Sequence, residues 1–243
     1  MSRFISKVLS PAVKLWLRSQ VNSVETLQFQ IEGGDRQLMS GDIPKVTIAA
    51  QQVIYQGIAL SYIHLVGETI RINLKEVVRG QPLRLLEPIP VQAEAIVHQA
   101  DLNASMNSPL LAEALSELVM MLLQSGLTAD LSTELQSELK PPIAVQSPAI
   151  KIGENHLILS ANLRSAASQQ STPFTLRTQL QIAEGHKIRF CQPEWLTHPN
   201  AETGQPLPHL ETFKIDLGPE VFLQQLTLSN EQLICQGQIR VMP

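Results

Sequence analysis

Apolar residues recur along the chain with two different periods, and the changes of period divide the sequence into segments. The apolar positions follow a helical period over residues 2–21 and again from Ser108-Pro109 to about Gly126. Between and after these stretches they recur at every second residue, which is typical of strands with one buried face. The order helix, strands, helices, strands therefore predicts an α+β fold.

The strand-like runs are short and are separated by glycines or by polar residues that suit turns. The apolar residues alternate in 27–31, 46–48, 58–62, 70–74, 91–97, 157–163, 174–182, 188–190, 213–217, 226–228 and 234–241. The expected turn glycines are Gly33-Gly34, Gly41, Gly57, Gly67 and Gly80. A polar, proline-rich loop is expected over 193–208. We expect one long antiparallel sheet that curls around a central apolar helix.

The N-terminal segment predicts an amphipathic helix. Its cations Arg3, Lys7, Lys14 and Arg18 fall within an arc of about 60° on a helical wheel, and apolar residues fill the opposite side. Ser10 as N-cap and Pro11 at the first helical position predict two helical pieces with a kink. The helix either packs its apolar side on the core or lies at a membrane interface. The residues expected at a membrane surface are Arg3, Phe4, Lys7, Val8, Lys14, Trp16 and Arg18.

The central helix is expected to begin with Ser108 as N-cap and Pro109 at the first helical position. Its second half is apolar nearly all round, so it is either a core helix or a helix that lies against an apolar ligand. A further helix is predicted over 129–140. The residues expected to line a site for acyl chains are Leu111, Leu115, Leu118, Val119, Met121 and Leu122.

Composition and charge narrow the classes of function. Only 16% of the 243 residues are charged and the net charge is −4, which argues against a nucleic-acid partner. The longest apolar run, Leu118–Leu123, is too short to span a bilayer. We see no secretory signal and no lipid-anchor cysteine near the start, so we expect cytoplasmic residence, peripheral to a membrane. Cys191 and Cys235 are expected to be buried thiols, or to pair if their strands are neighbours.

A search for catalytic chemistry favours a binding protein over an enzyme. The sequence contains no nucleophile elbow, phosphate-binding loop, dinucleotide fingerprint or zinc-protease motif. The six histidines are dispersed, so we expect no metal and no cofactor. Ser137-Glu138-Leu139-Lys140 has the SxxK form but lacks companion motifs, and Asp101-Leu102-Asn103 suits a turn or a cap.

Several segments in the same order resemble the bacterial LmeA-like phospholipid-binding proteins, over most of the chain. They are Gly41–Val46, Val53–Leu60, His64–Gly67, Gly80–Pro88, Asp101–Pro109, Phe213–Gly218 and Gly237–Val241. The resemblance implies a β-rich protein that binds lipid without known catalysis, similar in shape to the tubular lipid-binding folds. Some relatives are exported or lipid-anchored, whereas this sequence shows neither feature, which puts more weight on the N-terminal helix as a membrane contact.

These observations lead to one main hypothesis and one alternative. The main hypothesis is a non-enzymatic protein that binds or transfers phospholipid or another acyl lipid and associates with an anionic membrane surface. The alternative is a peripheral scaffold that binds an unidentified protein partner. The expected organisation is an amphipathic helix over residues 1–22, followed by a single β-rich domain over 23–243.

Overall fold

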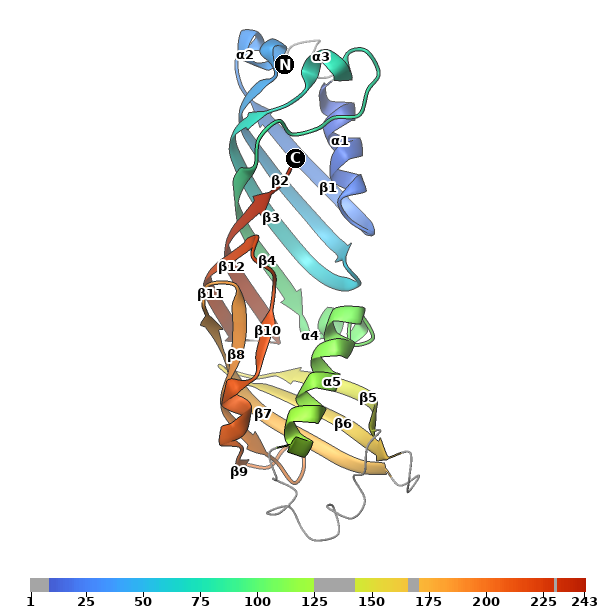
Figure 1. Cartoon of the computed structure of the whole chain (residues 1–243), viewed down its shortest axis with the longest axis vertical. Helices are drawn as coiled ribbons and strands as arrows, with labels where there is room; N and C mark the ends of the chain where they lie inside the picture. The colour runs from blue at the N-terminus through green and yellow to red at the C-terminus, as the bar shows by residue number, and fades with distance from the viewer. Residues whose placement is uncertain (1–8, 125–142, 166–170, 230) are drawn as a thin grey trace. The chain divides into compact units, whose positions relative to one another are not determined.

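The computed structural model describes residues 9–124, 143–165, 171–229 and 231–243, and its elements are labelled in Figure 1. The chain divides into two compact units. Unit 1 contains the residues up to Val97 together with Pro219–Gln225 and Ile234–Pro243, and unit 2 contains His98–Gly218 and Leu226–Leu233. The sequence predicts an N-terminal helix followed by one domain over 23–243. Compact units do not show which parts fold independently, so this division stays a prediction.

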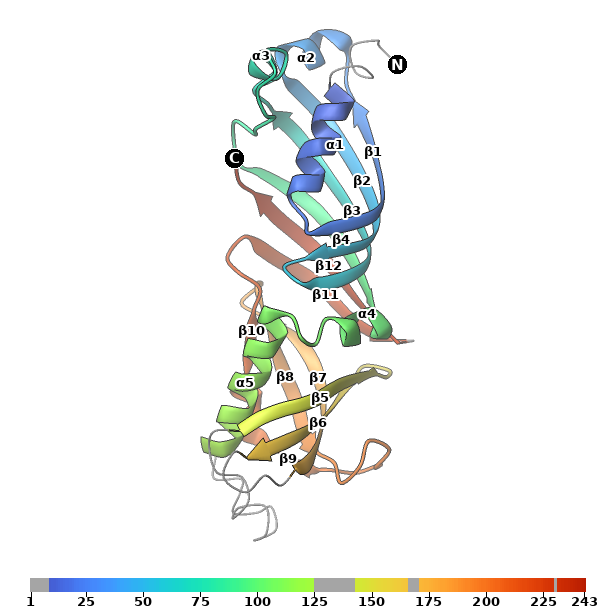
Figure 2. The same ribbon diagram turned by 90° about the vertical axis from the view of Figure 1, so that its right-hand side faces the viewer.

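Unit 1 is built on the first sheet, whose strand order is β1-β2-β3-β4-β12-β11. Neighbouring strands from β1 to β4 are antiparallel. The elements are α1 (Ser10–Ser19), β1 (Ser23–Glu32), α2 (Asp35–Ser40), β2 (Asp42–Tyr55), β3 (Ile58–Arg71), α3 (Leu74–Val77), β4 (Ile89–His98), β11 (Val221–Ser229) and β12 (Gln232–Val241). The residues of β11 and β12 within Leu226–Leu233 are counted in unit 2. Helix α1 lies on one face of this sheet (Figure 2).

Unit 2 is built on the second sheet, whose strands follow the order β10-β8-β7-β6-β5, with β9 paired to β8. Every pairing in this sheet is antiparallel. The elements are α4 (Gln99–Ala104), α5 (Pro109–Gln124), β5 (Ile143–Ile152), β6 (Leu157–Ser165), β7 (Ser171–Ala183), β8 (Lys187–Trp195), β9 (Gln205–Pro206), η3 (Pro208–Thr212) and β10 (Lys214–Asp216). Helix α5 contacts β5 and η3.

The α+β prediction is confirmed, and the described strands are mostly antiparallel. The expectation of one long sheet around a single helix is wrong, because the described strands form two sheets. Each of these sheets has a helix of its own, α1 in unit 1 and α5 in unit 2. The expected loop over 193–208 is partly wrong, since Pro193 lies inside β8 and η3 begins at Pro208.

Two glycines show where the turn predictions hold and where they fail. Gly57 forms the β2–β3 hairpin turn with Gln56, and both have positive φ, at 81° and 51°. Gly67, expected at a turn, instead lies within β3, paired with Val46 and Val91. A Cβ atom on Gly67 would lie 3.2 Å from the Cδ1 of Ile70. Glycine therefore leaves room at this position for the side chain of Ile70.

Candidate functional site

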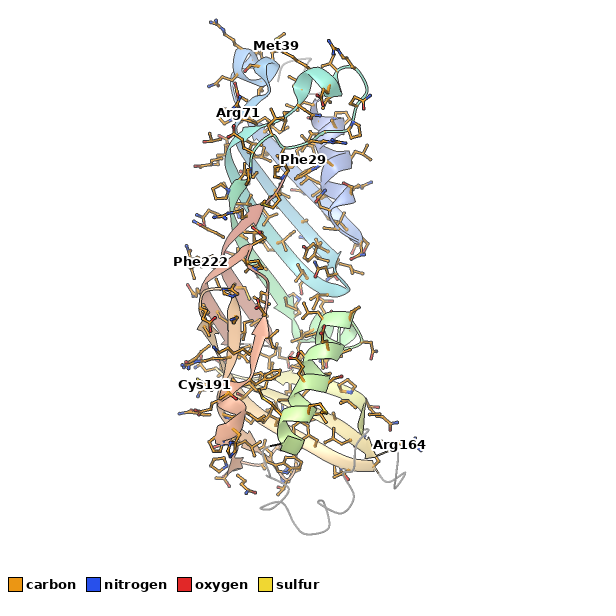
Figure 3. The ribbon with its side chains drawn as sticks, viewed as in Figure 1. Phe29, Met39, Arg71, Arg164, Cys191 and Phe222 are labelled. Carbon is orange, nitrogen blue, oxygen red and sulfur yellow. The ribbon has the colours of Figure 1, made fainter. Side chains whose placement is uncertain are left out.

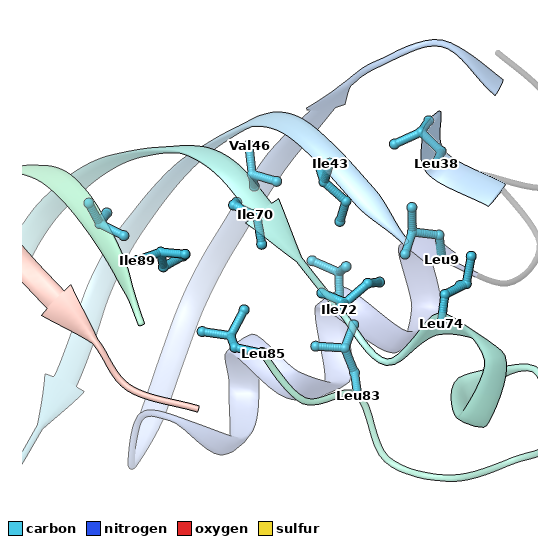
Figure 4. Close-up of a cluster of buried hydrophobic side chains, with 12 residues drawn as sticks. Leu9, Leu38, Ile43, Val46, Ile70, Ile72, Leu74, Leu83, Leu85 and Ile89 are labelled. Carbon is cyan, nitrogen blue, oxygen red and sulfur yellow. The ribbon is translucent and has the colours of Figure 1, made fainter. Parts of the chain in front are cut away.

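Helix α1 packs its apolar side on the first sheet. Leu9 and Val13 are buried in a cluster with residues of β2, β3 and β4, and Trp16 and Leu17 pack partly against it (Figure 4). The helix begins at Ser10, with Leu9 rather than Ser10 in the cap position, and Pro11 lies in its first turn as expected. The predicted helical piece before Ser10 lies outside the described residues.

The expected membrane-surface residues fall into three groups. Arg3, Phe4, Lys7 and Val8 lie outside the described residues. Lys14 and Arg18 are exposed on α1 and form no ion pair within the described part of the chain. Trp16 is half-buried against the cluster. Leu15 lies among these residues on α1 and is 73% exposed, so α1 presents both charge and one large apolar side chain to solvent.

The face of the first sheet that meets α1 is apolar across four strands. Residues that pair directly across β1, β2, β3 and β4 point to the same side of the sheet. Three such rows can be followed from β1 to β4 and contain only apolar side chains and one glycine. The rows are Ile31–Val46–Gly67–Val91, Phe29–Ile48–Leu65–Ala93 and Leu27–Ala50–Ile63–Ala95. We call this surface the inner face.

Helix α1 covers the inner face unevenly. In the first row, Val46 and Val91 are buried in the cluster that contains α1. The second row packs against that cluster only in part. The third row lies outside the cluster, and its Leu27, Ile63 and Ala95 are half-buried rather than buried. The apolar surface therefore continues beyond the part that the protein's own helix covers.

The opposite face of the same strands has a different character. Polar side chains occupy most of its positions, and Glu94 accepts a hydrogen bond from Nε2 of Gln236 at 2.9 Å. Members of this face include Gln28, Gln30, Thr47, Gln51, Tyr62, His64, Gln92 and Glu94. A strong contrast between two faces of one sheet marks the apolar face as the one that is covered by protein or by an apolar ligand.

The structure also places the residues predicted on the central helix. The Ser108 hydroxyl accepts a hydrogen bond from the backbone N–H of Leu111 at 3.4 Å, and α5 begins at Pro109, so the predicted helix start is confirmed. Leu118 and Val119 are buried in unit 2. Leu111, Leu115 and Met121 are half-buried, and the structure does not describe the side chain of Leu122. The further helix predicted over 129–140 also lies outside the described residues.

The described residues show few features of a catalytic or metal-binding site. In the described part of the chain, no group of three His, Cys, Asp or Glu side chains is placed to hold a metal ion. Cys191 and Cys235 are both free and partly buried, and burial raises the pKa of Cys235 to about 11. Ser137 and Lys140, which form the SxxK sequence, lie outside the described residues. Among the helices that the structure describes, none has the length and apolarity to cross a membrane.

Together these features define an α+β protein with one apolar sheet face that its own helix covers only in part. The chain belongs to the LmeA-like phospholipid-binding family, whose model matches residues 1–238. The resemblance drawn from the sequence segments is thereby confirmed. The comparisons with curated proteins and with solved structures find no match, so the family model carries this assignment.

Sequence reasoning did not identify the inner face as a candidate site. The alternation in 27–31, 46–48 and 91–97 indicated three of its strands and their buried side. The missing information was how far α1 reaches across the four strands, because helix cover depends on contacts between distant segments. One feature of the sequence could have indicated this face. In β1 and β4, apolar and polar residues alternate over a length greater than one short helix can cover.

Proposed function

We propose that the protein binds phospholipid without catalysing a reaction on it, and that acyl chains lie against the inner face of the first sheet. The observation that carries this proposal is the third row of the inner face, in which Ala50 is buried but the apolar Leu27, Ile63 and Ala95 are only half-buried. Membership of a phospholipid-binding family supports the choice of ligand.

The energetics suit reversible binding. Burying one methylene group contributes about 0.8 kcal/mol, so covering roughly ten of them contributes about 8 kcal/mol before the cost of association. A dissociation constant of about 1 µM would require this whole value as net free energy, so after the cost of association the binding from water is weaker than 1 µM. In a bilayer the same methylenes are already buried, so the transfer of a lipid from bilayer to protein changes this contribution little. Such a balance favours exchange, which is the property that a lipid-transfer protein needs.

Helix α5 offers a second surface for acyl chains within the same proposal. Leu111, Leu115 and Met121 keep part of their surface exposed, and a methionine adapts its shape to an irregular ligand. Leu118 and Val119 are buried within unit 2, so their contribution is to hold the helix in place. Leu122 completes the predicted set.

We also propose that the protein associates peripherally with an anionic membrane. The exposed cations Lys14 and Arg18, the exposed Leu15 and the preceding Arg3, Phe4, Lys7 and Val8 support this role for the N-terminal segment. Trp16 suits an interface, but most of its packing is with the protein's own cluster. Each cation near an anionic surface contributes about 1 kcal/mol.

Lipid binding is tested by native mass spectrometry of the purified protein and by titration with a fluorescent phospholipid. Ile63→Asn places an amide on the inner face, and we expect it to weaken binding severalfold. Val66→Asn is the matched control, because Val66 lies on the same strand, is also half-buried and points to the opposite face. Equal binding by both variants and the wild type would contradict the inner-face proposal. If Ile63→Asn does not fold, Leu27→Asn tests the same row from the edge strand.

Membrane association by α1 requires substitutions that leave the core intact. Deleting residues 2–21 is unsuitable, because it removes Leu9 and Val13 from the buried cluster. The combined variant Lys14→Gln, Leu15→Ser and Arg18→Gln changes only exposed side chains. We expect it to sediment less with vesicles that contain phosphatidylglycerol. Unchanged sedimentation, together with unchanged sedimentation after deletion of residues 2–8, would contradict this role.

A further inference from the structure

One end of unit 1 is formed by two short helices that lie side by side, α2 and α3 (Figures 1 and 2). Gly41 ends α2 with a φ of 90°, and its carbonyl oxygen accepts a hydrogen bond from the N–H of Ile72 at 2.9 Å. A Cβ atom on Gly41 would lie 2.6 Å from the Ile72 oxygen and 3.4 Å from the Cβ of Leu74. This close approach holds α2 and α3 together. We call residues 33–41 and 73–84 the α2–α3 tip.

In the tip, α2 and the segment of α3 with its cap residue Val78 direct apolar side chains both inward and outward. Leu38 and Leu74 are buried in the cluster that contains α1. Met39 is 63% exposed and Val78 is 60% exposed. Figure 3 shows Met39 at the extreme end of unit 1, beyond the last strand residues. Both side chains are therefore available to an apolar partner outside the protein.

The tip is held in a fixed shape by Asn73. Its Nδ2 donates to Oε2 of Glu76 at 2.8 Å and to the carbonyl oxygen of Pro82 at 3.0 Å, and its Oδ1 accepts the N–H of Arg84 at 2.7 Å. Asn73 is itself 8% exposed. These bonds close the loop that follows α3, so Val78 projects from a rigid base rather than from a free loop.

The charge of the tip matches an anionic surface. Its cations are Arg36, Lys75, Arg79 and Arg84. All four are exposed, and none forms an ion pair with a described residue. Its carboxylates are only Asp35 and Glu76. Outside the tip, on β2 and β3, Lys45 pairs with Glu32 and Arg71 pairs with Asp42 and Glu87. The tip thus carries four exposed cations without an ion pair in the same two segments as Met39 and Val78.

The other end of β2 and β3 provides a comparison within the same unit. Ile54 and Tyr55 at the β2–β3 hairpin are 39% and 49% exposed, so apolar exposure is present there too. The sequence contains no lysine or arginine from Val46 to Ile70, however. The hairpin residues themselves thus supply no cation for anionic headgroups, whereas the α2–α3 tip combines exposed apolar side chains with cations of its own.

We propose that the α2–α3 tip docks on a bilayer that contains anionic phospholipid, with Met39 and Val78 among the upper acyl chains and Arg36, Lys75 and Arg79 at the headgroups. The inference deepens the proposed membrane association and rests on it. The first described residue, Leu9, belongs to the same buried cluster as Leu38 and Leu74.

The test is co-sedimentation of the full chain with vesicles of phosphatidylcholine alone or of equal parts phosphatidylcholine and phosphatidylglycerol. The charge variant is Arg36→Gln, Lys75→Gln, Arg79→Gln, and its matched control is Lys151→Gln, Arg164→Gln, Arg240→Gln, all at exposed cations outside the tip. The apolar variant is Met39→Ser, Val78→Ser, and its matched control is Ile54→Ser, Tyr55→Ser. All substitutions lie at exposed positions, and thermal unfolding verifies that each variant folds.

We expect both tip variants to bind the mixed vesicles about tenfold or more weakly than the wild type, and both controls to bind within about twofold. Wild-type binding to mixed vesicles should fall steeply with added salt. As a second measurement, Met39→Trp should show a blue-shifted emission on mixed vesicles, and Tyr55→Trp should not. Unchanged binding of both tip variants would overturn the tip proposal.

The outcomes separate this inference from the proposed function. Loss of vesicle binding in the α1 variant, with normal binding in the tip variants, overturns the tip and leaves peripheral association through α1. Absence of wild-type binding to mixed vesicles overturns both membrane proposals. Binding of a fluorescent phospholipid in the absence of vesicles reports on the inner face alone, and the tip variants should retain it.

Discussion

The side-chain amide of Asn103 pairs with the backbone of Ile150 as a neighbouring strand would. Its Nδ2 donates to the Ile150 carbonyl oxygen at 2.8 Å, and its Oδ1 accepts the Ile150 N–H at 2.7 Å. Gln99 extends the pairing, since its Oε1 accepts the N–H of Ile152 at 2.7 Å. Two side chains of α4 thus satisfy the backbone of β5, which lies at the edge of the second sheet.

This pairing is one of several contacts that give polar residues of Asp101–Pro109 a structural role. Asn103 bonds to β5, Ser105 donates to the Asp101 carbonyl oxygen at 2.7 Å, and Ser108 caps α5. Three polar side chains of this short segment, Asn103, Ser105 and Ser108, therefore have structural partners. The segment joins the first turn of α4 to α5 and ties both to the second sheet.

Replacing Asn103 by alanine should destabilise unit 2. The change removes two hydrogen bonds to Ile150 and leaves its N–H and carbonyl without their partner, at a cost of about 2–3 kcal/mol. The measurement is urea-induced unfolding monitored by circular dichroism. Asn107→Ala is the control, because Asn107 is exposed in the same segment, and it should change the unfolding free energy by about 0.5 kcal/mol or less. Equal effects of the two substitutions would contradict the role of Asn103.

Alternating apolar and polar residues predicted the strands whose backbone is regular. The sequence did not predict β5, because its register shifts between Gln146 and Ala149, where Ser147 has a φ of 50°. A bulge adds a residue to one strand, so the apolar positions on its two sides differ in parity. Val145 and Ile150 consequently do not follow one period of two, and the run resembles a loop.

Gly67 illustrates a limit of local reasoning. Glycine between two alternating runs is most simply a turn, yet here the side chains of Ile70 and Val91 occupy the space beside it. That packing depends on β4, which is distant in sequence from the β2–β3 hairpin. The division into two sheets has the same origin, since β12 returns from the end of the chain to lie beside β4.

The sequence predicts some parts of the candidate sites and not others. The cations and apolar side of α1 and the start of α5 follow from periodicity and capping. The half-buried residues in the third row of the inner face do not, because they depend on the position of α1 on the sheet. The α2–α3 tip was also missed, because its two parts lie at separate turns, Gly33–Gly41 and Asn73–Arg84, that only the folded chain brings together.

Acid should weaken the contacts around Glu184 in a defined pH range. Glu184 accepts hydrogen bonds from Lys187 and from Lys214, each at 2.5 Å, and these lower its pKa from about 4.5 to about 2. A lowered pKa means that the ionised form is stabilised in the folded state, so this contribution is present above pH 4.5. It is lost as the pH falls from about 4.5 to about 2.

Thermal unfolding between pH 5 and pH 2 measures this effect. We expect the wild type to lose more stability over that interval than Glu184→Gln, because the glutamine cannot be protonated. The difference should be small, since the Glu184 side chain is 46% exposed and water screens the ion pairs. Identical pH profiles would show that the lysines do not hold Glu184 in its ionised form.

Cys235 should react slowly with alkylating reagents. Burial raises the pKa of its thiol to about 11, so the nucleophilic thiolate is scarce near neutral pH. Labelling with iodoacetamide, followed by peptide mass spectrometry in a Cys191→Ser background, measures its rate. We expect slow labelling of the native protein and rapid labelling in urea. Native labelling as fast as that of the unfolded chain would contradict the buried position.

Two leucines of the N-terminal region, Leu9 and Leu15, separate the packing role of α1 from its proposed membrane role. Leu9→Ala should cost about 2–5 kcal/mol of unfolding free energy, because the side chain is fully buried among Leu38, Leu74 and their neighbours. Leu15→Ala should leave stability within about 0.5 kcal/mol, because Leu15 is 73% exposed, yet it should weaken sedimentation with anionic vesicles. If Leu15→Ala lowered the unfolding free energy more than Leu9→Ala, α1 would pack its other side on the sheet. That result would also undo the assignment of the inner face, because the same cluster defines which side of β1, β2, β3 and β4 the helix covers.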